Sequence, residues 1–141
     1  MDKIMLSHIR ATIPVRQSEG AAGLDLSCVE DVVLEPNKPT VVQTGISIQL
    51  SNPNEHIQIV SRSGLSRRGI VALNSPGIVD SDFRGELKVI LMNFSTDTIT
   101  LIAGSRIAQL LIMTSRPATF KRVDALDCTT RGENGLGSTG I

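Results

Sequence analysis

Apolar residues in this chain alternate with polar residues or form short runs, and Gly, Pro, Asn and Ser separate these stretches. The clearest alternation is Ile-Ser-Ile-Gln-Leu at residues 46–50. A period of two is typical of a β-strand that buries one face. The pattern predicts strands at residues 32–34, 40–42, 46–50, 57–59, 87–92, 98–101 and 107–113.

A helical period is almost absent from the chain. One short helix is predicted near residues 63–68, because Ser63 can cap its start and no proline interrupts it. Many short strands at a spacing of about ten residues indicate an all-β sandwich or barrel.

The composition narrows the classes of function. Of the 141 residues, 40% are hydrophobic and 20% are charged, which is typical of one globular domain with its own core. The formal net charge is zero, with no Trp or Tyr and three Phe, so we expect no stable nucleic-acid binding. No apolar run is long enough to span a bilayer, and the start of the chain lacks a signal-peptide pattern. We therefore expect a cytoplasmic protein without a membrane partner.

The cysteines and histidines are isolated in the sequence. Cys28 and Cys128 lack the spacing of a metal site, and we expect Cys28 to be buried and Cys128 to lie near the surface. A disulfide between them can form but is not required in a reducing compartment. His8 and His56 have no Ser or Cys partner in a recognisable setting, so we expect no catalytic role for either.

Three segments could carry chemistry, and each has a plainer alternative. Arg62, Ser63 and Gly64 combine donors that suit a phosphate, but a solvated basic turn has the same composition. Residues 74–86 include Asp80 and Asp82, which suit a general base or a metal, although Asp82 could equally form a surface ion pair with Arg84. The glycine-rich end, residues 131–141, is either a frayed terminus or a flap that closes over phosphate.

Taken together, these segments resemble the trimeric dUTP pyrophosphatase (dUTPase) family. Five ordered motifs of that family match, and so many in order are hard to obtain by chance. The matching stretches are residues 22–26 (Ala-Gly-Leu-Asp-Leu), 62–70 (Arg-Ser-Gly-Leu-Ser-Arg-Arg-Gly-Ile), 77–86 (Gly-Ile-Val-Asp-Ser-Asp-Phe-Arg-Gly-Glu), 106–110 (Arg-Ile-Ala-Gln-Leu) and 131–140 (Arg-Gly-Glu-Asn-Gly-Leu-Gly-Ser-Thr-Gly).

The resemblance implies a jelly-roll-like β barrel at residues 1–130 and a mobile, glycine-rich arm at residues 131–141. It further implies a homotrimer in which each active site is shared between subunits and is closed by the arm of a neighbour. The implied reaction is the hydrolysis of dUTP to dUMP and pyrophosphate with Mg²⁺. It would keep uracil out of DNA and supply dUMP for thymidylate synthesis.

The resemblance also assigns roles to single residues. Asp80 matches the catalytic aspartate, which orients and deprotonates the water that attacks the α-phosphorus. Asp25 matches an aspartate that contacts the metal through water, while substrate phosphates hold most of the Mg²⁺. Uracil is read in the family by a hairpin, here expected at residues 70–79. The implied substrate contacts are Arg62, Ser63, Gly64, Asn74, Gly77, Phe83, Gln109, Arg131, Leu136, Gly137, Ser138 and Thr139.

This chain departs from the family pattern at four positions. Phe83 stands where Tyr is usual, so a ring can still pack beneath deoxyribose but one hydroxyl is lost. Leu136 replaces a Phe that covers the uracil, which weakens stacking. Ser61 replaces a frequent Pro, and Arg68 a frequent Lys; we expect both changes to be tolerated.

Two other functions fit parts of the sequence. A dCTP deaminase has a related barrel, but it uses a glutamate near the position of Ile90, where this chain has no acid. A catalytically weak, nucleotide-responsive regulatory protein is the second alternative, and the changes at Phe83 and Leu136 leave room for it.

Overall fold

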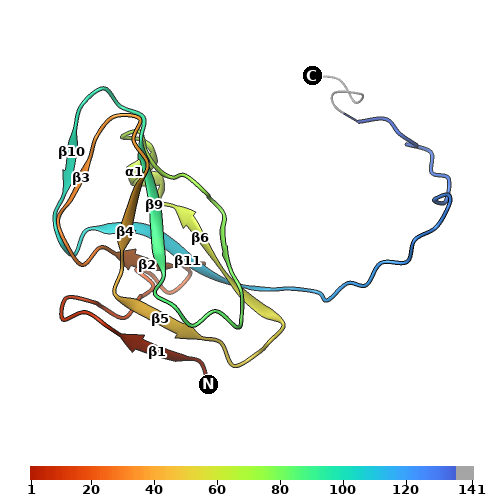
Figure 1. The fold of residues 1–141 in the computed structure, drawn as a ribbon, viewed down its shortest axis with the longest axis horizontal. Helices are drawn as coiled ribbons and strands as arrows, with labels where there is room; N and C mark the ends of the chain where they lie inside the picture. The colour runs from red at the N-terminus through yellow and green to blue at the C-terminus, as the bar shows by residue number, and fades with distance from the viewer. Residues whose placement is uncertain (136–141) are drawn as a thin grey trace.

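The computed structural model describes residues 1–135, and nearly all of their regular structure is β (Figure 1). The strands are β1 (Lys3–Leu6), β2 (Leu24–Ser27), β3 (Val32–Leu34), β4 (Thr40–Gln43), β5 (Ile46–Gln49), β6 (Glu55–Ser61), β7 (Ile70–Ala72), β8 (Gly77–Val79), β9 (Lys88–Asn93), β10 (Ile99–Leu101) and β11 (Arg106–Thr114). One helical turn, α1 (Ser63–Ser66), lies between β6 and β7. The all-β prediction is confirmed, and every strand predicted from the alternation is present.

The strands form four antiparallel sheets around one core. Their orders are β1-β5, β10-β3, β2-β11-β6-β8 and β4-β9-β7. β11 is central to the largest sheet, because it pairs with β2 along one edge and with β6 along the other. Within the described residues, the hydrogen-bonded ladder does not close into a complete barrel.

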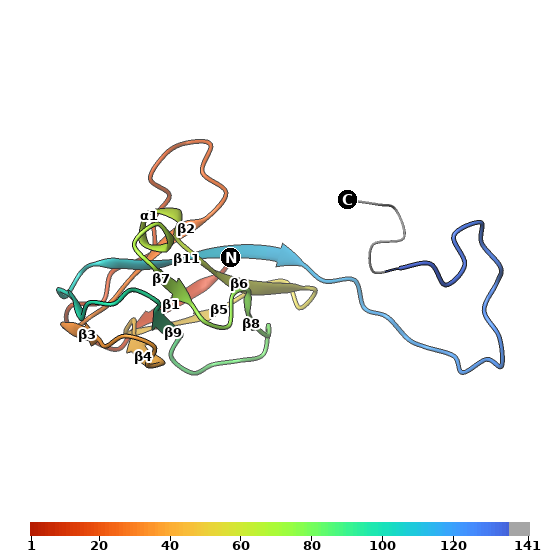
Figure 2. The same ribbon diagram turned by 90° about the horizontal axis from the view of Figure 1, so that it is seen from above.

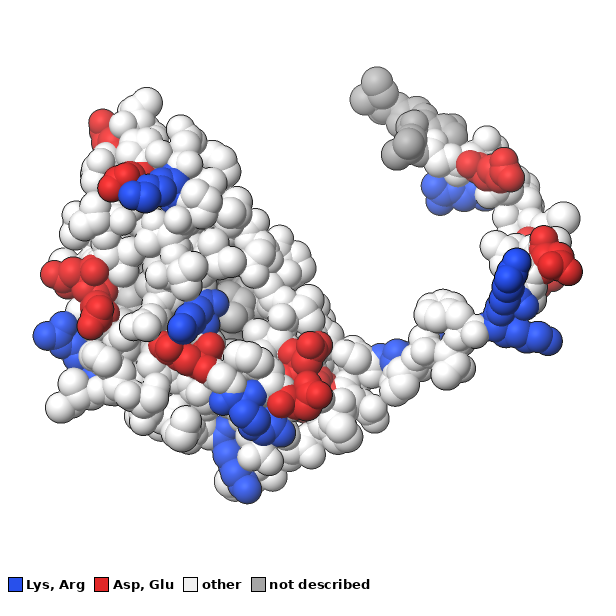
Figure 3. Space-filling model, in the orientation of Figure 1, with Lys and Arg blue, Asp and Glu red and all other residues white. Residues whose placement is uncertain are grey.

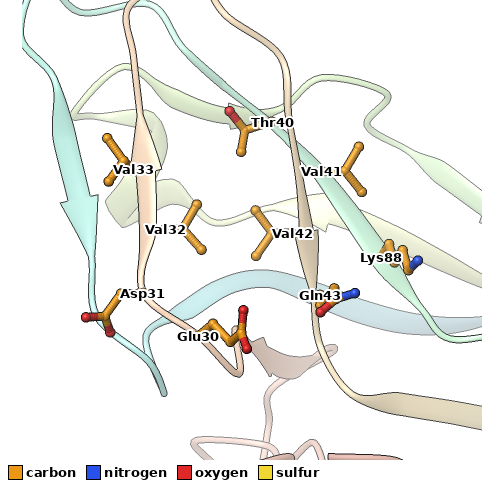
Figure 4. A pocket seen from close by; sticks show the side chains of 9 residues that line it. All are labelled: Glu30, Asp31, Val32, Val33, Thr40, Val41, Val42, Gln43 and Lys88. Atoms are coloured by element: carbon orange, nitrogen blue, oxygen red, sulfur yellow. The ribbon is translucent and has the colours of Figure 1, made fainter.

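The ladder is open between β3 and β4. Among residues 1–135, β3 pairs with β10 and β4 pairs with β9, so one edge of each strand is left without a partner strand. A cavity of about 350 Å³ lies between these edges, and Val32 and Val42 point into it from opposite sides (Figure 4). Its lining residues are Glu30, Asp31, Val32, Val33, Thr40, Val41, Val42, Gln43 and Lys88.

The core is aliphatic. Its largest fully buried side chains include Leu26, Leu34, Ile46, Ile70, Leu87, Leu91, Ile107 and Leu110. Cys28 lies among them, as predicted, and burial raises the pKa of its thiol. Cys128 is exposed, as predicted, and both cysteines are free thiols.

One polar side chain, Asn93, is completely buried in this core. Its amide nitrogen donates to the carbonyls of Leu34 and Asp97, at 2.9 and 2.8 Å. Its amide oxygen accepts from the backbone N–H and the hydroxyl of Ser95, at 2.9 and 2.7 Å. The amide is thus satisfied on both sides, which joins the end of β9 to β3 without an unpaired buried group.

After β11 the chain leaves the sheets. Residues 115–135, which we call the extension, contain no strand or helix and are exposed throughout. Both ribbon views show the extension running outward from the end of β11 and away from the body, residues 1–114 (Figures 1 and 2). The predicted boundary at residue 130 between barrel and arm stays a prediction.

The short helix was predicted correctly, but its start differs from expectation. Ser63 is the first helical residue, and the capping position falls on Arg62, whose backbone is extended. Arg62 makes no capping bond with its side chain, which points elsewhere. Ser66 instead donates its hydroxyl hydrogen bond back to the carbonyl of Arg62, at 3.1 Å.

Candidate active site

The best-organised polar cluster centres on Asp25, whose side chain is only 4% exposed. Its Oδ1 accepts hydrogen bonds from Nε of Arg62 at 3.2 Å and from Nε2 of Gln109 at 3.3 Å. Its Oδ2 accepts from Nη1 of Arg106 at 3.0 Å. We call Asp25, Arg62, Arg106 and Gln109 the Asp25 cluster. A buried carboxylate is stable only when it is paired in this way.

Strand pairing explains how these side chains meet. Asp25 on β2 lies opposite Gln109 on β11, and Arg62 follows the end of β6, the other neighbour of β11. On a regular strand, Arg106 and Gln109 would point to opposite faces, because side chains alternate. The register shifts between Arg106 and Ala108, and this bulge brings both side chains to Asp25.

Sequence reasoning missed Arg106 as a member of the site. The residue stood in a matching motif, but neither its position nor its type distinguished it from a surface arginine. Its carbonyl also accepts a hydrogen bond from Nη1 of Arg62 at 2.9 Å, so the two arginines are joined twice. A β-bulge could have been the signal, but no residue in this stretch of sequence marks one.

The cluster carries a net positive charge. Arg62 and Arg106 bring two positive charges and Asp25 one negative charge, while Gln109 is neutral. Ser63 and Gly64 are exposed beside it, and nothing lies within 4 Å of where a side chain at Gly64 would begin. A phosphate oxygen could therefore approach the backbone here. The arrangement suits an anion with several oxygens, since guanidinium groups bind phosphate through paired donors.

Residues 70–79, where the base-recognition hairpin was expected, contain β7, a turn and β8, but these two strands do not pair with each other. We keep the name hairpin for this segment. β7 pairs with β9, and β8 pairs with β6. Ser61 ties the hairpin to β6: its hydroxyl accepts from the backbone N–H of Ala72 at 2.9 Å, and its own N–H donates to Oγ of Ser75 at 3.2 Å. A proline, frequent at position 61 in the family, has no N–H for the second bond.

Asn74 and Gly77 lie close together within this hairpin. A Cβ atom placed on Gly77 would lie 3.1 Å from Nδ2 of Asn74. Glycine at position 77 therefore leaves the Asn74 amide room to lie across the hairpin. Two of the predicted substrate contacts are thus adjacent.

Asp80 follows β8 directly and lies beside Phe83. The backbone N–H of Phe83 donates to the carbonyl of Asp80 at 3.1 Å. Nη1 of Arg84 donates to the carbonyls of Ser81 and Phe83, both at 2.8 Å, which fixes the turn; the predicted pairing of Arg84 with Asp82 is replaced by these backbone contacts. A cavity of about 140 Å³ is lined by Ile78, Val79, Asp80 and Phe83.

Within one chain, Asp80 is far from the Asp25 cluster. Val79 lies opposite Ile57 in the β6–β8 pair, and continuing that register puts Asp80 opposite His56, near the start of β6. Arg62 follows the other end of β6. That length of extended strand corresponds to about 20 Å. The structure therefore separates the predicted site residues of the body into two sets.

The third predicted set lies in the extension. Nε of Arg131 donates to the carbonyl of Asn134 at 2.8 Å, so among residues 1–135 the side chain of this arginine bonds within its own local turn. Leu136, Gly137, Ser138 and Thr139 lie outside the described residues.

A magnesium ion would have to be held mainly by groups other than protein side chains. Among residues 1–135, no three His, Cys, Asp or Glu side chains gather into a metal-binding group. Asp25 uses three acceptor positions for Arg62, Arg106 and Gln109, which leaves about one of the four lone-pair positions of a carboxylate. The residues present fit a contact to Mg²⁺ through water and do not fit direct coordination.

On the face drawn in Figure 3, acidic and basic side chains are interspersed over the body and along the extension. No helix in the described part of the chain has the length and apolar character that crossing a membrane requires.

These features define an all-β protein with a positively charged cluster that suits an anion and a separate carboxylate beside an aromatic ring. The family model for dUTPase matches residues 10–140, so the chain belongs to the dUTPase family. A deoxyuridine 5′-triphosphate nucleotidohydrolase of Wolinella succinogenes is 45% identical over 139 residues, covering 98% of this chain and 93% of its own. One from Helicobacter pylori strain J99 is 44% identical and covers 99% and 96%.

Solved structures agree with this membership. A mutant dUTPase of Staphylococcus bacteriophage 80alpha, solved with dUpNHpp, superposes with a TM-score of 0.91 at 25% identity and covers 100% of this chain and 99% of its own. A mutant dUTPase from phage phi11 of S. aureus, described with a structural Mg(II) ion, has a TM-score of 0.83 at 22% identity and covers 91% and 99%. The second likeness concerns the fold alone.

Proposed function

We propose that this chain hydrolyses dUTP to dUMP and pyrophosphate with Mg²⁺, in active sites shared between the subunits of a homotrimer. The observation that carries the proposal is the separation of the site residues within one chain. The Asp25 cluster can hold a polyphosphate and Asp80 can activate water, but they lie at opposite ends of β6. In a dUTPase, a second subunit would bring the two sets together.

The nucleoside would bind beside Asp80. Backbone donors and acceptors of residues 70–79, with the Asn74 amide, would read the uracil edge, and a tight hairpin would exclude the methyl group of thymine. Phe83 would pack beneath the deoxyribose from the other side of the cavity that it lines with Asp80. Hydrogen-bond readout of this kind discriminates strongly, because a wrong base leaves buried polar groups unpaired.

The triphosphate would extend toward the Asp25 cluster. Its oxygens would be bound by Arg62, Ser63, Gly64 and Gln109. Asp25 would hold the side chains of Arg62 and Gln109 in place before substrate arrives. Such preorganised donors stabilise the charge that develops on the phosphates. Bound Mg²⁺ would supply further charge neutralisation on the phosphate oxygens. The remaining acceptor position of Asp25 suits one water on that ion.

Asp80 would act as the general base. Its carboxylate would orient a water molecule toward the α-phosphorus and take its proton as the bond to the pyrophosphate oxygen breaks. Holding the water in line with the leaving group supplies much of the rate acceleration, because the entropy cost of orienting the water is met before the reaction step.

The C-terminal arm would close the site of a neighbouring subunit. Arg131, Ser138 and Thr139 would bind the terminal phosphates, and Leu136 with Gly137 would cover the base. The direction of the extension, outward from the body, supports a reach toward another chain (Figures 1 and 2). We further propose a cytoplasmic location, where the enzyme would limit uracil in DNA and supply dUMP.

The activity is tested by measuring pyrophosphate release from dUTP, with and without Mg²⁺. We expect turnover of dUTP and little turnover of dCTP, dTTP or UTP. Ammonia release from dCTP would instead identify a deaminase, and binding of dUTP without turnover would identify a regulatory protein. Either result would overturn the proposal.

The shared site is tested by mixing two inactive variants. Asp80→Asn lacks the base, and a deletion after Thr130 lacks the arm. Trimers that are reassembled from both should contain some sites with an intact base and an intact arm, so activity should return. A monomer that is fully active by itself would contradict the shared site.

A further inference from the structure

The aromatic ring of Phe83 lies directly against the backbone of Gly85. A Cβ atom placed on Gly85 would lie 2.5, 3.1 and 3.2 Å from three ring atoms, Cζ, Cε2 and Cε1. The first distance is far inside van der Waals contact. The backbone of Gly85 does not lie in the left-handed region, so its conformation does not itself require glycine. Glycine at this position is therefore explained by the ring.

The backbone around Gly85 is held on both sides. Arg84 binds the carbonyls of Ser81 and Phe83, as described above. Beyond Gly85, a carboxylate oxygen of Glu86 accepts from the backbone N–H of Gly45 at 2.8 Å, and the N–H of Leu87 donates to Ile46 at 2.8 Å. An added methyl group could not be accommodated by moving this backbone without breaking those bonds.

The ring itself is free to move. Phe83 is 44% exposed, so it can turn into solvent without disturbing the core. A side chain at position 85 would therefore displace the ring and leave the fold intact. Because Phe83 lines one cavity with Asp80, the displacement would change the wall against which a bound sugar rests.

We infer that Gly85 is a specificity-determining position. Because glycine has no side chain, the Phe83 ring can lie against the Gly85 backbone, and in that position it admits 2′-deoxyribose and excludes a 2′-hydroxyl. This inference rests on the proposed function, in which Phe83 packs beneath the sugar. Gly85 contacts no substrate in this account and acts through the ring. It is a positioning residue whose effect appears in the choice between sugars.

The test is Gly85→Ala, assayed for kcat and KM with dUTP and UTP and for thermal stability. We expect the preference for dUTP over UTP to fall by roughly tenfold, mainly through a higher KM for dUTP and a lower one for UTP. The thermal midpoint should stay within about 2 °C of wild type. Gly20→Ala is the matched control, since nothing lies within 4 Å of a side chain there.

A double-mutant cycle separates action through the ring from any other effect. In a Phe83→Ala background, Gly85→Ala should leave the preference between dUTP and UTP unchanged, because no ring remains to be displaced. An equal effect with and without the ring, an unchanged preference in the single variant, or an unfolded Gly85→Ala protein would each overturn the inference.

The position of the ring can also be measured without turnover. In NMR spectra, nuclear Overhauser contacts between the Phe83 ring protons and the Gly85 α-protons should be present in wild type. Their absence in wild type would overturn the packing of the Phe83 ring against Gly85. If they are present while dUTP is not hydrolysed, the proposed function fails and the packing of the ring remains.

Discussion

The Asp25 cluster and the extension contrast in how they are held. The cluster draws side chains from β2, β11 and the end of β6 onto one buried carboxylate. The extension is exposed throughout residues 115–135, and within that range the side chain of Arg131 bonds to its own turn. The difference indicates that the fold of the body organises the Asp25 cluster, whereas the extension, under the proposed function, would become ordered only on meeting substrate or another subunit.

This division has an energetic reason. Asp25 fixes the side chains of Arg62 and Arg106 when the body folds. The loss of their conformational entropy is then a cost of folding and not of substrate binding. Under the proposed function, an exposed extension would let substrate enter and product leave.

The largest expected effect is on the body side, at Asp80. Asp80→Asn should lower kcat by at least about a hundredfold, because an amide cannot take a proton from water. Binding of a non-hydrolysable dUTP analogue, measured by calorimetry, should change little. Asp82→Asn is the matched control and should be far milder. If Asp80→Asn kept more than a tenth of the wild-type turnover, Asp80 would not be the base.

Asp25→Asn should weaken both the fold and phosphate binding. Loss of the charge leaves Arg62 and Arg106 without their counterion, which we expect to destabilise the protein by about 3 kcal/mol. Urea unfolding measures the loss of stability, and KM for dUTP measures the effect on the site. Asp97→Asn, at an exposed position, should leave both unchanged. A stable Asp25→Asn variant with normal KM would show that the cluster is not preorganised by Asp25.

The two thiols report on the two regions separately. Cys128 in the extension should react with a thiol reagent promptly, while Cys28 should react only on unfolding, because burial keeps it inaccessible and raises its pKa. A non-hydrolysable dUTP analogue should slow labelling of Cys128 if the arm closes over substrate. In Cys128→Ser the fast phase should disappear. Unchanged labelling with the analogue bound would argue that the extension stays open.

The smallest change in substrate binding is expected at Leu136, which is not among the described residues. Leu136→Phe should tighten dUTP binding by up to about tenfold, or roughly 1.4 kcal/mol, because an aromatic ring gains stacking on uracil. Preference for uracil over cytosine and thymine should hardly change, since that readout is assigned to the hairpin. Michaelis constants for the three nucleotides decide it. Equal or weaker binding of dUTP would mean that residue 136 does not cover the base.

The regular parts of the fold follow from the sequence alone. Alternation at residues 46–50 and the apolar run at 107–113 predicted β5 and β11 because each strand buries one face or both. β1 and β2 were missed. β1 is short and largely exposed, while β2 places the buried, charged Asp25 where an apolar residue would have marked a strand. Periodicity cannot identify a charge that is neutralised by partners distant in sequence.

The site was only partly predictable for the same reason. The motif match located Asp25, Arg62 and Gln109, and the structure brings these three together. It could not indicate that Arg106 joins them, because that depends on a local register shift in β11. The motif match also could not indicate that Arg62, and not Ser63, occupies the capping position of the helix. The side chain of Arg62 makes no capping bond there and donates to Asp25 instead. Tertiary partners decided both outcomes.

The open ladder between β3 and β4 bears on solubility. Strand edges that lack a partner are the places where β-proteins recruit foreign strands and aggregate, and two such edges face the cavity in Figure 4. Glu30, Asp31 and Lys88 place charge around that cavity, which opposes intrusion by another apolar strand. Salt that screens these charges should therefore hasten aggregation through the two edges.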